Sequence, residues 1–187
     1  MQSVIPMVSN SMNTKPLSTR DRRAYKALFE PAGVSESQFK RLLSSSVLDW
    51  KTVQGEQGIT SGVHKQDRRH TYWLYHGDAA VYNNEKLVHS VQRKWKDASR
   101  YAGLGLLREE RLFENVGEAT RMAFPVSATV KAGETGATVL RIDTSRLDGL
   151  MQHDTELANS MRLMLFRGMQ DKVAAHCYDS ESCLIDY

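Results

Sequence analysis

The sequence predicts a mainly β domain, an antiparallel β-roll or jelly roll, with two short helices before it and a long C-terminal helix after it. Three observations support this fold class. Short alternating segments separated by turn residues fill residues 47–142, serine-capped amphipathic segments precede them, and an apolar stretch of helical period follows Asp154. Seven short strands at this spacing are typical of a sandwich or jelly roll and not of a parallel α/β sheet.

The N-terminal part predicts two short amphipathic helices. Residues 1–17 have no periodicity and are expected to form a loose arm. Ser18 is the expected cap of the first helix and has Asp21 in its first turn, while Ser35 and Gln38 form a capping-box pattern for the second. Each cap is followed by apolar side chains at helical spacing: Ala24, Tyr25, Leu28 and Phe29 after the first, then Phe39, Leu42 and Leu43 after the second.

The period changes to two at Val47. Turn signals at 55–58, 77–78, 83–84 and 133–136 separate seven expected strands. These are Val47–Val53, Ile59–His64, His70–His76, Ala79–Tyr82, Lys86–Val91, Val126–Ala132 and Ala137–Ile142.

An interruption and two further helices complete the chain. The strand pattern stops between Lys94 and Phe124, where an insertion that carries function is expected. Asp143 is the expected cap of a short helix, and Asp154 that of a long one reaching about His176. The predicted organisation is therefore an arm at 1–17, one domain at 18–176 and a tail at 177–187.

The composition excludes several function classes. A net charge of +3 with scattered basic clusters does not resemble a nucleic-acid footprint, and no apolar run approaches transmembrane length. His70 and His76 lie about 20 Å apart on an extended strand, so they cannot share a metal ion. Catalytic signatures are absent, so we expect neither catalytic nor metal residues, and no cofactor.

The two cysteines bear on the location of the protein. Cys177 and Cys183 lie at the end of the chain, which favours a reducing, cytoplasmic location.

Several motifs, in order along the chain, carry a family resemblance. The segment Tyr72–Ser90 resembles the strand–Gly–strand–turn–strand signature of cyclic-nucleotide-binding domains, and Pro125–Ala132 resembles their phosphate-binding cassette. The Popeye branch of this superfamily is more similar still. Leu28–Ser35 and Trp95–Tyr101 resemble two Popeye motifs, and Glu156–Val173 resembles the closing helix of that domain.

This resemblance implies a β-roll that senses cyclic AMP without catalysis. Val126 stands where ordinary cassettes carry the arginine that pairs with the cyclic phosphate, and 101–107 contains no acid for the ribose. Losing one charge-assisted contact costs about 1.5–3 kcal/mol, or roughly ten- to a hundredfold in affinity. Asp97 is kept from the Popeye pattern, whereas Arg100 stands where that pattern has a glutamate.

The expected ligand site follows from these matches. Asp97 would bind the sugar or phosphate edge, Arg100 or Lys96 would replace the missing cation, and Ser127 and Thr129 would line the cassette. The alternative is a solvent-facing loop with no ligand.

The long helix suggests a second function class, a ligand-free interaction or homodimerisation module. Apolar side chains occupy most of the surface of this helix, so other parts of the protein must pack against it on more than one side. It packs over the roll or meets a second copy, and a protein partner could also dock on it. Membrane association would then come only through such a partner. The expected interface residues are Met161, Met164, Leu165 and Met169.

Overall fold

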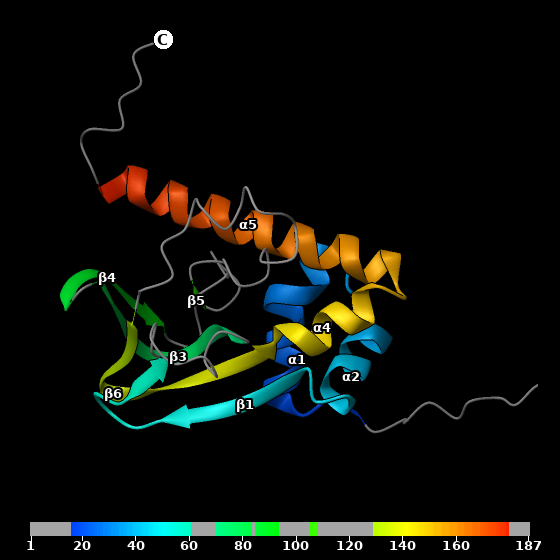
Figure 1. The fold of residues 1–187 in the computed structure, drawn as a ribbon, viewed down its shortest axis with the longest axis horizontal. Helices are drawn as coiled ribbons and strands as arrows, with labels where there is room; N and C mark the ends of the chain where they lie inside the picture. The colour runs from blue at the N-terminus through cyan, green and yellow to red at the C-terminus, as the bar shows by residue number, and fades with distance from the viewer. Residues whose placement is uncertain (1–15, 61–69, 84, 94–104, 108–128, 180–187) are drawn as a thin grey trace, which may run out of the picture.

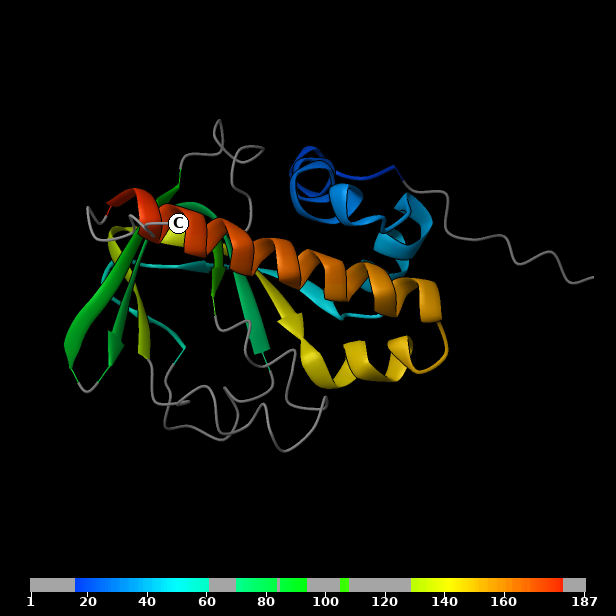
Figure 2. The ribbon, with the colours of Figure 1, turned by 90° about the horizontal axis from the view of Figure 1, so that it is seen from above.

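The computed structural model describes residues 16–60, 70–83, 85–93, 105–107 and 129–179. It is an antiparallel sheet with helices packed along it, which confirms the predicted fold class. The N-terminal helices and α4 gather at one end of the strands (Figure 1). The long helix α5 runs lengthwise over the sheet, as the view from above makes clear (Figure 2).

The N-terminal helices begin where their caps predict. α1 (Thr19–Ala24) starts after Ser18, whose Oγ accepts a hydrogen bond from the Asp21 N–H at 3.1 Å. α2 (Glu36–Ser44) starts with the full capping box of Ser35 and Gln38. A π-helical turn (Tyr25–Phe29) and a 3₁₀ turn (Glu30–Ala32) join them, ending at Gly33 with φ 87°. Tyr25, Leu28 and Phe29 of the π-helical turn are all buried.

The strands form one sheet of order β1–β6–β3–β4, in which β2 also pairs with β6 and β5 with β3. All these pairs are antiparallel. The strands are β1 (Leu48–Val53), β2 (Gly58–Thr60), β3 (His70–Asn83), β4 (Lys86–Arg93), β5 (Leu106–Leu107) and β6 (Thr129–Asp143).

Two of the predicted turns are wrong. The structure has single long strands, β3 and β6, that run through 77–78 and 133–136. Gly77 has φ 95°, and a Cβ there would lie 2.1 Å from the Gly136 carbonyl oxygen. The register of β3 against β6 also shifts between Gly77 and Ala79. The glycines therefore allow bulges and close approach of two backbones, and the strands bend without ending.

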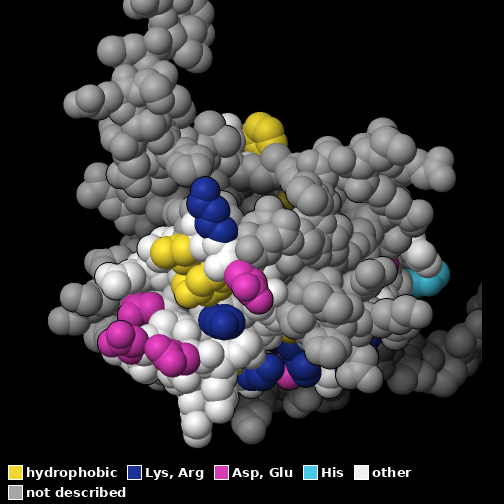
Figure 3. All heavy atoms as spheres, turned by 60° about the vertical axis from the view of Figure 1, so that its left-hand side comes forward, with side chains coloured by type: hydrophobic (Ala, Val, Ile, Leu, Met, Phe, Trp, Pro, Cys, Tyr) yellow, Lys and Arg dark blue, Asp and Glu magenta, His cyan; other side chains and the backbone are white. Residues whose placement is uncertain are grey.

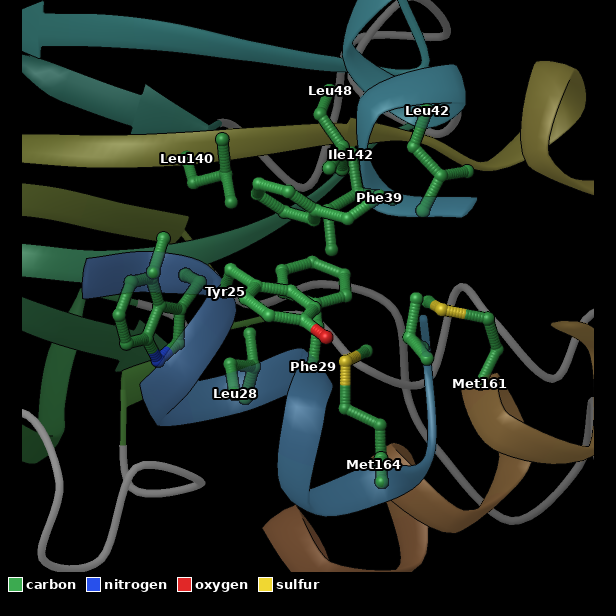
Figure 4. Close-up of a cluster of buried hydrophobic side chains, with 14 of the residues drawn as sticks. Tyr25, Leu28, Phe29, Phe39, Leu42, Leu48, Leu140, Ile142, Met161 and Met164 are labelled. Atoms are coloured by element: carbon green, nitrogen blue, oxygen red, sulfur yellow. The ribbon is translucent and has the colours of Figure 1, made fainter. Parts of the chain in front are cut away.

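The sheet separates two apolar cores. Trp73, Tyr75, Leu140 and Ile142 belong to the core between sheet and helices, while their strand neighbours point to the other side. Figure 4 shows the helix-side core, where Phe29 and Phe39 lie against sheet and α5 side chains. We call the sheet face away from the helices the inner face. Its buried residues are Val53, Ile59, Tyr72, Leu74, Ala79, Val91, Leu107, Val130, Ala132, Ala137 and Val139.

The last two helices begin at the predicted caps. Asp143 precedes α4 (Thr144–Met151), and its side chain accepts a hydrogen bond from the Arg146 N–H at 3.0 Å. α5 (Thr155–Asp179) follows Asp154, whose Oδ1 accepts from the Leu157 N–H at 2.8 Å. α5 therefore extends to Asp179, slightly beyond the end that periodicity predicts.

Candidate functional site

The predicted ligand residues fall mostly outside the described part of the chain. Lys96, Asp97, Arg100 and Ser127 lie in segments that the structure does not describe, so their roles stay predictions. Thr129 is the first residue of β6, half-buried and opposite Tyr82 of β3. The predicted strand alternation is confirmed just after it, because Val130 and Ala132 are buried and Lys131 is exposed.

Three of the four predicted interface residues lie in the chain's own core. Met161, Met164 and Leu165 are at most 3% exposed and pack with the N-terminal helices and the sheet. Figure 4 shows Met161 and Met164 pointing from α5 toward Phe29 and Tyr25. The Met169 side chain is outside the described set. Among the described side chains of α5, the large apolar ones that are exposed are instead Leu163, at 41%, and Phe166, at 56%.

The inner face carries a polar row at the end nearest α4. Asp49, Arg141, Tyr72 and Leu107 are directly opposite one another across β1, β6, β3 and β5. Residues opposite one another in antiparallel strands share a face. Arg141 therefore lies on the same face as Val139 and Tyr72, which are buried among the apolar residues of the inner face.

Asp49 and Arg141 form a two-bonded ion pair. Arg141 donates from Nε to Asp49 Oδ1 at 2.8 Å and from Nη2 to Oδ2 at 2.7 Å. The Asp49 hydrogen bonds raise the pKa of Arg141 above its usual value. The two side chains remain 37% and 45% exposed. The guanidinium is therefore oriented by two hydrogen bonds, and both side chains remain partly accessible to solvent.

Sequence reasoning missed this pair, although one signal was present. The strand 137–142 alternates, with Ala137 and Val139 on one face, so period two assigns Arg141 to that same apolar face. A charged residue on such a face needs a partner. The partner lies 92 residues away in the sequence, so spacing alone could not identify it.

On the helix side of the sheet, a second group of polar side chains links α2 to the start of α5. Asp154, the α5 cap, also accepts a 3.4 Å hydrogen bond from Gln38 Nε2 and forms an ion pair with Arg41, both on α2. The Leu157 backbone bond, with Arg41 and Gln38, lowers the pKa of Asp154 below its usual value. Further along α5, Arg167 donates to the Pro31 carbonyl oxygen. The N-terminal helices and α5 are thus bonded together at two points.

The described residues offer little support for other kinds of site. Within them, no group of His, Cys, Asp and Glu side chains could hold a metal ion, and no helix is long and apolar enough to cross a membrane. Acidic, basic and apolar side chains are intermixed on the face that Figure 3 shows.

Comparison with known proteins shows a shared fold. No protein-family model and no curated protein matches the sequence. Among solved structures, a protein from Geobacter metallireducens provisionally named as cyclic nucleotide-binding is similar at a TM-score of 0.58 and 14% identity. That match covers 84% of this chain and 98% of the other.

Two further solved structures are similar over most of this chain. A cyclic nucleotide-binding domain from Methylobacillus flagellatus has a TM-score of 0.57 and 13% identity, over 89% of this chain and 87% of that one. The sensor domain of the transcriptional regulator DNR from Pseudomonas aeruginosa has a TM-score of 0.50 and 18% identity, over 87% and 93%. The chain therefore has the cyclic-nucleotide-binding-domain-like fold.

Proposed function

We propose that this chain is a non-catalytic regulatory domain that binds a cyclic nucleotide, with cyclic AMP as the first ligand to test. The observation that carries the proposal is the shared fold, which extends over most of this chain and of structures named as cyclic nucleotide-binding. We place the domain at 18–176. The Popeye-like motifs of the sequence favour a sensor of this type whose phosphate cassette has departed from the ordinary pattern at Val126.

The two faces of the sheet give this function a physical basis. The inner face carries buried apolar residues with the partly exposed Asp49–Arg141 pair beside them. The opposite face packs directly against the N-terminal helices and α5. A ligand bound on the inner face would then act on the helices through a single sheet. Asp97, Arg100, Lys96, Ser127 and Thr129 remain the proposed contacts of that ligand.

Thermal shift and calorimetric titration test the proposal. Ligand at a hundred times its dissociation constant stabilises a protein by about 2.7 kcal/mol. For a domain of this size, that raises Tm by about 5–10 °C. Titration with cyclic AMP and cyclic GMP should show saturable heat. No heat and no Tm shift at millimolar concentrations of either ligand would refute the proposed function.

A second candidate is a ligand-free homodimerisation module. It is favoured by Leu163 and Phe166, which are exposed and three residues apart on α5, so they are neighbours on the helix surface. The test is light scattering of the wild type and of Phe166→Glu. A wild-type dimer that becomes monomeric in the variant supports an α5 interface. A wild-type monomer, or a dimer that persists in the variant, refutes it.

A further inference from the structure

We propose that Arg141, held by Asp49, is the phosphate-binding cation of the ligand site. This inference rests on the proposed function and names one residue of its site. The ligand class is a nucleotide whose phosphate carries one negative charge on two free oxygens, as a cyclic phosphate does.

The geometry of the guanidinium is the first argument. Arginine has five N–H donors in a planar fork. Asp49 uses one N–H on Nε and one on Nη2 of Arg141. Among the described residues, none accepts a hydrogen bond from the opposite edge, formed by Nη1 and the second N–H of Nη2. That edge has the spacing that binds two phosphate oxygens at once.

The role of Asp49 is the second argument. A free arginine side chain must lose rotamer freedom when it binds an anion. Here the two bonds to Asp49 already orient the guanidinium, so binding loses less side-chain entropy. Asp49 is therefore a positioning residue, and its carboxylate need not leave when phosphate binds.

The charge around the pair is the third argument. Lys51 lies two residues beyond Asp49 on the same strand face and is exposed. Asp143 lies two residues beyond Arg141 on its strand, but it accepts from the Arg146 N–H and pairs with the Arg146 side chain at 3.6 Å. With two cations against one carboxylate, the group of Asp49, Lys51 and Arg141 has a net charge of +1, which favours an anion.

The position of the pair is the fourth argument. Arg141 is opposite Tyr72, and Tyr72 is opposite Leu107. The apolar residues Val139 and Leu74 form the neighbouring row of the same face. Val139 and Leu74 are fully buried, so a phosphate would bind the partly exposed guanidinium at the edge of the buried apolar residues. Arg141 of β6 would then replace the phosphate-binding arginine that ordinary cassettes carry at the position of Val126.

Calorimetric titration with cyclic AMP and cyclic GMP tests the inference in the wild type, Arg141→Gln, Arg141→Lys and Arg162→Gln. Arg162 is the matched control, because it is an exposed arginine bonded to the nearby Asn159 side chain but lies on α5, away from the inner face. We expect Arg141→Gln to weaken binding about ten- to a hundredfold, Arg141→Lys to weaken it less, and Arg162→Gln to change it less than about twofold. Circular dichroism checks that each variant is folded.

The outcomes separate the two hypotheses. Wild-type binding that Arg141→Gln leaves unchanged overturns the role of Arg141 while the proposed function stands. Equal weakening by Arg141→Gln and Arg162→Gln also overturns it, since that result reflects net charge alone. If the wild type binds neither nucleotide, the proposed function fails and this inference fails with it.

Discussion

Replacing Asp154 by alanine removes three interactions at the point where α2 meets the start of α5. The carboxylate accepts the Leu157 N–H at 2.8 Å and the Gln38 side chain at 3.4 Å, and it pairs with Arg41. Losing an N-cap acceptor costs about 0.5–2 kcal/mol. The ion pair adds less than about 1 kcal/mol, because Arg41 is 43% exposed and water screens the charges.

We therefore expect Asp154→Ala to lower the free energy of unfolding by about 1–2 kcal/mol, and Tm by about 2–8 °C. Asp154→Asn should cost less than about 1 kcal/mol, because asparagine caps helices as well as aspartate does. Urea denaturation measures both. Glu156→Ala is the control, since it removes an exposed acid from the same helical turn.

The pH dependence gives an independent check. The pKa of Asp154 is lowered in the folded protein from an ordinary value of 3.8. A carboxylate with a lowered pKa stabilises the fold fully above that value, and the contribution is lost as the pH falls through the lower folded pKa. The stability difference between wild type and Asp154→Asn should therefore shrink below pH 3.8. If Asp154→Ala and Asp154→Asn both stay within about 0.5 kcal/mol of wild type at neutral pH, Asp154 does not join the two helices as argued.

Three further predictions concern the fold. Gly77→Ala should destabilise by at least about 1–2 kcal/mol, because φ is 95° and the new Cβ would meet the Gly136 carbonyl, whereas Gly58→Ala meets nothing within 4 Å; urea midpoints that move equally would contradict this. Met164→Glu should unfold the domain by burying a charge at a site that is 1% exposed, while Phe166→Glu should shift stability by less than about 0.5 kcal/mol; a folded Met164→Glu in circular dichroism would refute the core assignment. Ser35→Ala should cost about 1 kcal/mol by removing the capping box of α2, and an unchanged thermal midpoint would show that the cap contributes nothing.

The candidate site was only partly accessible to prediction. The family resemblance assigned the ligand contacts to residues near Asp97 and Ser127, and the fold it implied is confirmed by the structural neighbours. Asp49 and Arg141 were not identified, because each is an ordinary charged residue in its own segment. Only the pairing of β1 with β6 brings them within 2.8 Å.

What the sequence alone determined is local. The starts of four helices, at Ser18, Ser35, Asp143 and Asp154, follow from caps that accept a hydrogen bond from the backbone N–H three residues ahead. Strand alternation likewise assigned Val130 and Lys131 to opposite faces, because the side-chain period is a property of the extended backbone.

Tertiary structure decided everything that depends on a distant neighbour. Glycine permits both a turn and a close backbone approach, so the sequence alone did not distinguish them at Gly77, where β3 continues and pairs closely with β6. An apolar helix can face its own core or another protein, and contact with the N-terminal helices buried Met161 and Met164 while leaving Phe166 in solvent. These outcomes are set by contacts between segments far apart in the chain, which no local pattern encodes.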